Sequence, residues 1–223
     1  MAGLLGKEGI VTRRPFVNPH HTISPQALAG GGKIPKPGAV SLAHRGVLFL
    51  DEFPEFNLSA LEILRQPIED KKVHIQRTFG SCVFPTDFLL IAAMNPCKCG
   101  YYPDRRRCSC TSVQIQKYLS RISGPLLDRI DICVEAGEVE LTELMDTEAV
   151  EESSEQIRER VCDAAEIQKK RFEGTGLHFN SEIGVREIKK YCKIGSKEER
   201  LIENAFKQSG FSARSLHRIL KTA

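Results

Sequence analysis

The sequence predicts an α/β protein in which a parallel sheet with flanking helices is followed by a small all-helical region. Short, unalternating apolar runs are separated by helical and loop segments, which is typical of strands buried on both faces of a parallel sheet. From about residue 141 onward only helical periodicity is found. We therefore expect two domains, residues 1–140 and residues 141–223.

The composition is that of an ordinary globular protein. The chain has 223 residues, 41% apolar and 27% charged, which is enough for a sizeable core. It has no apolar run of the 18 or so residues that a membrane helix needs, and its first residues do not read as a signal peptide. We expect a cytoplasmic protein with no membrane partner. The net charge of +3 is too small to indicate nucleic acid by itself.

The first 45 residues are rich in Gly, Pro and His, and they predict loops with a short hairpin. The Gly30–Lys33 segment is not a phosphate-binding loop, because no Ser or Thr follows the lysine and no strand precedes the glycines. We interpret His20 and His21 as packing residues of a loop, since two adjacent histidines are too little to indicate a metal site.

Local patterns predict the remaining elements. Apolar runs indicate strands, alternation indicates a hairpin, and capping residues and glycines mark helix ends. In order, these are a strand at 47–50; a helix at 58–66, capped by Asn57, with Ser59 and Glu62 at capping-box spacing, and stopped by Pro67; a hairpin over 73–84; a strand at 88–93; a helix at 112–121; a strand at 130–134; a helix through Ile157 and Phe172; a short helix around Ile188; a helix from Ser196; and a helix capped by Ser212.

Two carboxylates follow the first buried strand. Asp51 and Glu52 come directly after Val47–Leu50, and ligands of open α/β sheets bind beyond the carboxyl ends of the strands. One carboxylate can hold a metal ion through water while the other orients an attacking water, and phosphoryl transfer needs both. Four apolar residues followed by Asp-Glu form a Walker B pattern. The alternative is two solvated acids after a core strand.

Four of the eight cysteines lie within fourteen residues, whereas a secreted disulfide scaffold would be shorter and richer in cysteine. Four thiolates suit a tetrahedral, structural Zn²⁺ site. Reduced thiols without a metal, or a disulfide, are the alternatives. The four residues are Cys97, Cys99, Cys108 and Cys110.

The segment between the two cysteine pairs is basic and aromatic. Residues 98–129 hold seven Lys and Arg against two Asp and Glu, a net charge of +5. Cations beside aromatic rings suit a nucleic-acid backbone with base stacking, and a solvated loop is equally consistent with this composition. The residues between the cysteine pairs are Tyr101, Tyr102, Arg105, Arg106 and Arg107.

Longer strings carry a resemblance over nearly the whole chain. Pro19–Ser24, Gly30–Gly38 and Leu42–Glu52 resemble the magnesium chelatase-like AAA+ ATPases. Asn95–Cys97 and Ser123–Asp131 are similar to the ComM/YifB competence-protein branch. The resemblance implies a partial AAA+ P-loop core over residues 1–140 and a helical lid over residues 141–223.

The resemblance also implies roles for single residues in binding and hydrolysing ATP with Mg²⁺. Asp51 corresponds to the Mg²⁺-side Walker B acid, Glu52 to the residue that activates water, and Asn95 to the sensor that helps place that water. Arg129 corresponds to an arginine finger that reaches into a neighbouring subunit, and Arg214 to a second sensor on the lid. For both arginines the alternative is a surface ion pair of little energetic value.

The implied function is a hexameric motor that acts on DNA as a branch-migration helicase in natural transformation. One alternative is a magnesium chelatase motor subunit that remodels a protein partner for metal insertion into a porphyrin; another is a non-catalytic binding module. By analogy with related motors, the hairpin at 73–84 is expected to enter a central pore. Because no phosphate-binding loop is found, we expect the C-terminal part of a longer protein, truncated at both ends, inactive alone and binding ATP weakly or not at all.

Overall fold

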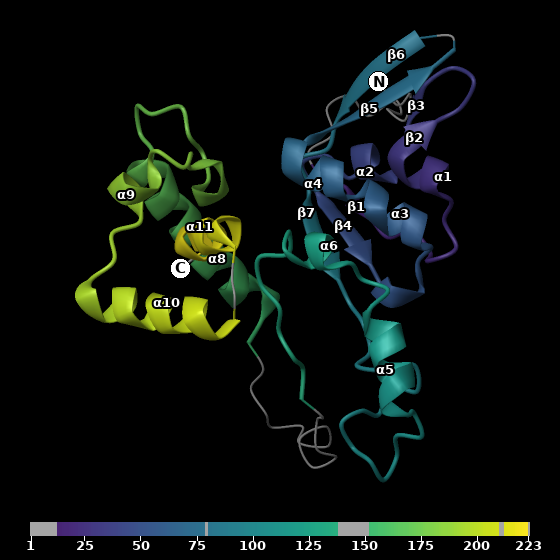
Figure 1. The fold of residues 1–223 in the computed structure, drawn as a ribbon. Coiled ribbons are helices and arrows are strands. Elements are labelled where there is room, and N and C mark those ends of the chain that lie inside the picture. Colours follow the sequence, from purple (N-terminus) through teal and green to yellow (C-terminus); the bar gives the residue numbers. More distant parts are fainter. Residues whose placement is uncertain (1–12, 79, 138–151, 210–211, 223) are drawn as a thin grey trace. The chain divides into compact units, whose positions relative to one another are not determined.

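A computed structural model describes residues 13–78, 80–137, 152–209 and 212–222. The chain divides into two compact units, one up to Ile130 and the other from Asp131 onward (Figure 1). The first combines a parallel sheet with short helices, and the second is helical. The predicted α/β class with a helical C-terminal region is therefore confirmed, and the arrangement is consistent with a partial AAA+ core.

A three-stranded parallel sheet organises the first unit. Its strands are β1 (Phe16–Val17), β4 (Val47–Leu50) and β7 (Leu89–Ala92), in the order β1-β4-β7. Val47 pairs with Leu89, and the register continues to the last residues of both strands. The strands predicted at 47–50 and 88–93 are confirmed, and their carboxyl ends lie at one edge of the sheet.

Only one face of this sheet is covered within the described part of the chain. Leu48 and Leu50 are fully buried, whereas the alternate side chains Phe16, Leu89 and Ile91 remain 65%, 60% and 42% exposed. The prediction that these strands are buried on both faces is therefore wrong for the described residues. An apolar run shows that a strand is hydrophobic, but it cannot show which segment covers each face.

The covered face packs against helices α1 (Pro25–Ala29), α2 (Ala39–Leu42) and α3 (Leu58–Ile63). Ser24 caps α1 by accepting the N–H of Ala27. The core that results is made of aliphatic and phenylalanine side chains drawn from helices, strands and the turn after β4. Its buried members are Leu28, Ala29, Ala39, Val40, Ala43, Leu48, Leu50, Phe53, Phe56, Ala60, Leu61, Leu64, Val73, Ile75, Ile122 and Leu126.

The helix predicted at 58–66 is two helices, α3 and α4 (Arg65–Asp70). Asn57 caps α3 as predicted, by accepting the N–H of Ser59 at 3.0 Å. The predicted capping box is wrong, because Glu62 binds Arg65 and Ser123 instead. Pro67 does not stop the helix. It lies in the first turn of α4, where a missing backbone N–H costs nothing.

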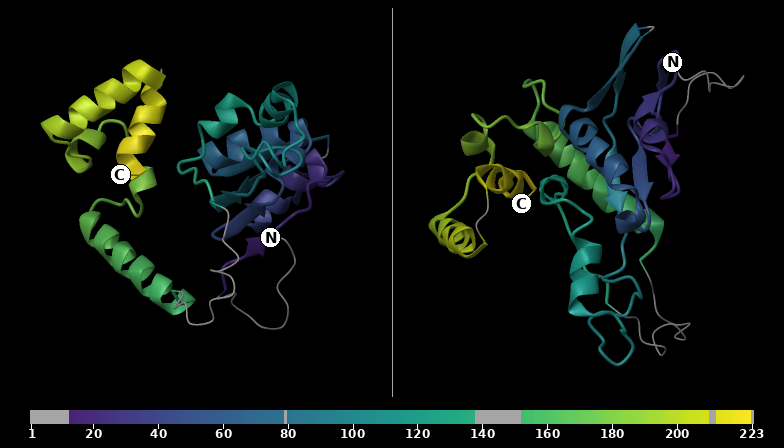
Figure 2. Two further views of the ribbon diagram at one scale, coloured as in Figure 1. Left: turned by 90° about the horizontal axis from the view of Figure 1, so that it is seen from below. Right: turned by 45° about the vertical axis from the view of Figure 1, so that its right-hand side comes forward.

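Two β-hairpins extend from the core of the first unit. The short hairpin expected in the first 45 residues is formed by β2 (Gly30–Gly31) and β3 (Lys36–Pro37). The hairpin predicted over 73–84 is formed by β5 (Lys72–Arg77) and β6 (Gly80–Pro85). The β5–β6 hairpin extends well beyond the sheet (Figures 1 and 2).

A second projection points away from the opposite end of the first unit. It contains α5 (Ser112–Leu119) and the loop before it (Figures 1 and 2). The helix predicted at 112–121 is confirmed, and it begins with a capping box between Thr111 and Gln114. A 3-10 turn, Phe53–Glu55, and α6 (Gly124–Leu127) complete this unit.

The strand predicted at 130–134 is not formed. Residues 132–137 carry no regular structure, and Ile132 and Val134 are 66% and 90% exposed. A strand exists only when a neighbour pairs with it, and no described segment pairs with this one.

The second unit contains α8 (Ser154–Arg171), α9 (Ile188–Tyr191), α10 (Ser196–Ser209) and α11 (Ala213–Thr222), with a 3-10 turn at Asn180–Glu182. The four predicted helices are present, and the Ser212 hydroxyl accepts the N–H of Ser215 as a cap. Among the described residues, no helix combines the length and apolar character of a membrane span. The core of the second unit comprises Phe172, Ile183 and Ile188, with Leu177, Tyr191, Cys192 and Leu220 packed against them.

A glycine allows β1 and β4 to approach. A Cβ on Gly46 would lie 1.9 Å from the Pro15 carbonyl oxygen, which accepts the N–H of Val47. We expect Gly46→Ala to lower the free energy of unfolding by about 2–3 kcal/mol, because the strands would have to separate. Urea denaturation of the variant measures this loss. Gly124→Ala is the control, because its Cβ meets nothing within 4 Å, and equal midpoints for the two variants would contradict the prediction.

Candidate active site and metal centre

Asp51 and Glu52 lie at the carboxyl end of β4, and both are exposed. The backbone hydrogen bonds between β4 and β7 continue past the ends of both strands. Leu50 O accepts the N–H of Ala93 at 2.9 Å, and Ala93 O accepts the N–H of Phe53 at 3.0 Å. Asn95 follows two residues later and is also exposed. The structure thus brings Asp51, Glu52 and Asn95 to the same edge of the sheet.

Glu52 has an unusual backbone conformation. Its φ and ψ of 51° and 43° are left-handed, which is uncommon for a residue other than glycine. Its N–H donates to Asp51 Oδ1 at 2.8 Å, and its carbonyl accepts the N–H of Glu55 at 2.7 Å. The Asp51 carboxylate is thus held against the backbone of the turn.

His21 contacts Glu52 directly. Its Nδ1 lies 2.8 Å from Glu52 Oε2, and its side chain is 28% exposed. The interpretation of His21 as a loop-packing residue therefore omits its contact with Glu52. No local pattern could have found it, because the two residues meet only through the pairing of β1 with β4.

Helix α5 packs near this turn. Burial, followed by the negative charge of Glu55, raises the pKa of the Tyr118 phenol, and Glu52 contributes in the same direction. Tyr118 is on α5 and is 8% exposed. The carboxylates of the turn after β4 therefore interact electrostatically with α5, the helix that follows the cysteine-rich loop.

The two predicted arginines lie in different units. Arg129 forms an ion pair with Glu69 of α4, donates to the Pro125 carbonyl, and is only 13% exposed. Arg214 is the second residue of α11, in the second unit. Neither is among the side chains that the first unit gathers at the end of β4.

The four clustered cysteines converge. Their Sγ atoms all lie within 4.8 Å of one another, and three of the distances are 3.3, 3.6 and 3.8 Å. A tetrahedron with metal–sulfur bonds of about 2.3 Å has sulfur–sulfur edges of about 3.8 Å. The cluster could therefore hold Zn²⁺ with little rearrangement. Its members are Cys97, Cys99, Cys108 and Cys110.

The pKa values of the thiols in the cluster are shifted in different directions. The backbone N–H of Tyr101, followed by the Cys97 thiol, lowers the pKa of Cys99 to about 6. Burial raises the pKa of Cys108 to about 11. A bound divalent cation would favour the thiolate form of both groups.

Aromatic and basic side chains surround the cluster on its loop. The Arg107 guanidinium lies 4.2 Å from the centre of the Tyr101 ring, and that of Arg105 lies 5.0 Å from the centre of the Tyr102 ring. All three arginines of the loop are exposed, and so is Tyr101. The loop therefore presents cations and a partly exposed aromatic ring to solvent.

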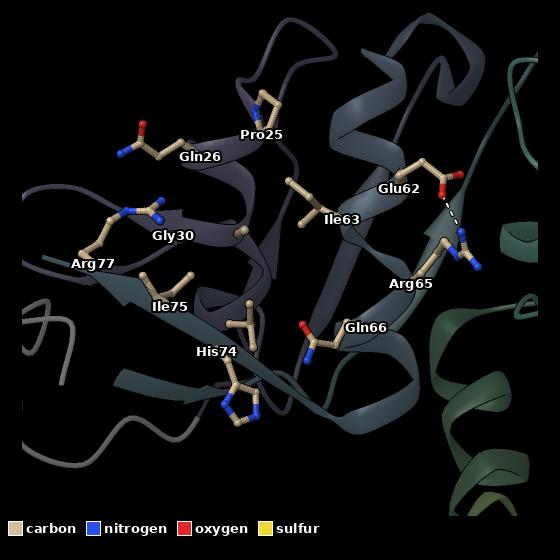
Figure 3. Close-up of a pocket in the computed structure, with 12 residues that line it drawn as sticks. Pro25, Gln26, Gly30, Glu62, Ile63, Arg65, Gln66, His74, Ile75 and Arg77 are labelled. Carbon is tan, nitrogen blue, oxygen red and sulfur yellow. Dashed lines mark hydrogen bonds and ion pairs between the residues drawn. The ribbon is translucent and has the colours of Figure 1, made fainter. Parts of the chain in front are cut away.

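A cavity of about 590 Å³ lies elsewhere in the first unit, between α1, α3, α4 and β5 (Figure 3). Ile63 and Ile75 line it together with the polar side chains Gln26 and Gln66. Glu62 and Arg65 form an ion pair at its rim (Figure 3). None of the residues predicted to act on ATP or to bind a metal lines this cavity.

Two families match the sequence. Residues 1–144 match the family described as magnesium chelatase, subunit ChlI, and residues 151–223 match the one described as magnesium chelatase, subunit ChlI C-terminal.

Curated relatives are similar over most of the chain. It is 43% identical over 211 residues to competence protein ComM of Haemophilus influenzae, and 42% identical to the uncharacterized protein YifB of Escherichia coli. An uncharacterized protein of Mycobacterium tuberculosis is 39% identical over 225 residues. These alignments cover 95%, 95% and 100% of the chain but only 40%, 41% and 44% of the relatives. The chain thus spans about two fifths of the length of these relatives.

Proposed function

Because the chain belongs to the magnesium chelatase ChlI family, we propose that the whole protein is an AAA+ ATPase that moves DNA. The observation that carries the ATPase proposal is the set of Asp51, Glu52 and Asn95 at the carboxyl edge of one parallel sheet. The name of the similar ComM protein, a competence protein, supports DNA as the substrate.

The three residues would divide the work of phosphoryl transfer. Asp51 suits the Mg²⁺ that accompanies ATP, because Mg²⁺ prefers carboxylate and water oxygens and this carboxylate is exposed. Glu52 would take a proton from water while the water oxygen bonds to the γ-phosphorus. The bond from that phosphorus to the bridging oxygen of the departing ADP breaks in the same step. Asn95 would hold the water, since an amide both donates and accepts.

The two arginines would complete the site in a ring of identical subunits. Arg129 would act in a neighbouring subunit as an arginine finger, and it would first have to leave Glu69. Arg214 would contact the γ-phosphate from the helical lid. The proposed ring is a hexamer, with the β5–β6 hairpin of each subunit in its central pore.

The cysteine loop would be a zinc-stabilised contact with DNA. Its four thiols fit a structural Zn²⁺ site without an open position for substrate. The exposed Arg105, Arg106 and Arg107 would contact phosphates, and the Tyr101 ring would stack on a base.

Reversing the charge of these three arginines should weaken DNA binding. We expect Arg105→Glu, Arg106→Glu and Arg107→Glu together to lower affinity at least about 100-fold and to reduce the salt slope by about 3, as the loss of three phosphate contacts requires. Fluorescence anisotropy with a labelled oligonucleotide at several salt concentrations measures both effects. The control reverses the same charge at Lys197, Arg200 and Lys207 of α10, and equal losses for the two triple variants would argue against a DNA contact at the loop.

ATP-dependent branch migration by the full-length protein tests the function. A four-way DNA junction with one labelled strand should be separated into two duplexes only when ATP and Mg²⁺ are present. The family description favours a second candidate, a chelatase motor that remodels a protein partner. An ATPase that neither binds nor moves DNA would favour that candidate, and a full-length protein without ATPase activity would refute both.

A further inference from the structure

The contact between His21 and Glu52 defines where a proton must be. A carboxylate oxygen only accepts hydrogen bonds, so an Nδ1 atom 2.8 Å from Glu52 Oε2 must carry a hydrogen. The contact occupies one oxygen of the carboxylate and leaves Oε1 for another partner. This arrangement suits a base that must present one oxygen in a fixed direction.

The His21 ring is itself held in place. It lies against the His20 ring, with centroids 4.1 Å apart, and it meets the edge of the fully buried Phe56 ring at 6.4 Å. The His20 ring bonds Thr22 Oγ1 at 2.9 Å, which fixes the turn that follows β1. The imidazole therefore approaches Glu52 from a segment that is held by ring packing and by this hydrogen bond.

The position of His21 complements that of Asn95. β1 and β7 lie on opposite sides of β4, so the segments that follow them flank the turn after β4. Glu52 lies between these segments in its left-handed conformation. Unusual backbone conformations concentrate at functional sites, where the surrounding structure must hold them.

We propose that His21 is a positioning residue for Glu52. Its Nδ1–H holds Oε2 so that Oε1 faces the water that Glu52 deprotonates. This role depends on the proposed ATPase function. His21 itself touches neither the water nor the nucleotide, so its loss should lower turnover rather than ATP binding.

Two substitutions separate the hydrogen bond from packing. His21→Phe keeps a ring against His20 and Phe56 but removes the donor, whereas His21→Asn keeps an N–H close to the position of Nδ1. In the full-length protein we expect His21→Phe to lower kcat about 10- to 100-fold with KM for ATP changed less than about threefold. His21→Asn should recover most of the loss. His178→Phe, the same replacement at an exposed histidine of the second unit, should stay within about threefold of the unmodified protein.

A second measurement does not depend on ATPase activity. In the 223-residue chain with ¹⁵N-labelled histidine, Glu52→Ala removes the acceptor and should move the His21 Nδ1 resonance. The His44 Nδ1 resonance is the internal control, because that atom accepts the N–H of Asp87 at 3.1 Å. An unmoved His21 resonance, or unchanged kcat in His21→Phe, would overturn the positioning role even if the ATPase is active. A moved resonance in a protein that hydrolyses no ATP would instead overturn the proposed function, and with it the role of His21 in hydrolysis.

Discussion

Glu52→Gln in the full-length protein will lower kcat for ATP hydrolysis about 1,000-fold, within the range expected for loss of a general base. Glutamine has nearly the same shape as glutamate, and its carbonyl can still accept the His21 Nδ1–H, so the turn should keep its conformation. The amide cannot take a proton from water. ATP binding should therefore persist, with Kd within about threefold of the original value, because the lost interaction belongs to the transition state.

Phosphate release measures turnover, and equilibrium binding of ATP to the same variant measures Kd. Glu55→Gln is the matched control, because Glu55 belongs to the same turn but is bound neither to His21 nor to Asp51 in the described structure. It should retain kcat within about threefold, since no general base is removed. Undiminished turnover in Glu52→Gln would show that another group activates the water.

The elements found from the sequence are those encoded by a local pattern. The alternation in Lys72–Arg77 and the helical spacing in Ser154–Arg171 each extend over enough residues to show their period, and Val47–Leu50 is an unbroken apolar run. Helix α1 has five residues and β1 has two, which is too few for any period. Their place is fixed by the core they help to form, and a single sequence does not display that core.

The candidate site likewise contains residues that a local pattern reveals and contacts that only the fold creates. Asp51 and Glu52 could be selected because parallel strands end at one edge, and that rule needs only the strand pattern. The contacts of Glu52 with His21 and of Arg129 with Glu69 join residues far apart in the chain. Such pairs are made by strand order and helix packing, so each partner read alone resembles an ordinary surface charge.

Removing the proposed zinc ion will unfold the cysteine loop while leaving the main core of the first unit intact. The loop has almost no apolar interior of its own: its hydrophobic cluster consists of Cys97, Cys108 and Ile115, with Cys99, Tyr102 and Cys110 packed against them. Structural zinc sites contribute about 10–16 kcal/mol of apparent binding free energy, which such a segment needs in order to stay ordered. Without the ion, thiols 3.3–3.8 Å apart would lose their common partner.

Metal analysis should find one Zn²⁺ per chain, and Cys108→Ser should abolish this stoichiometric binding. After chelation, amide hydrogen exchange over residues 97–119 should accelerate at least about 100-fold, the change expected when local opening becomes about 2.7 kcal/mol easier. Exchange in α2 and α3 should stay slow, because their side chains belong to the separate main core. Cys82→Ser, at a thiol on β6 outside the cluster, should bind zinc as before. A metal-free chain with the same exchange pattern would show that the four thiols pack without an ion.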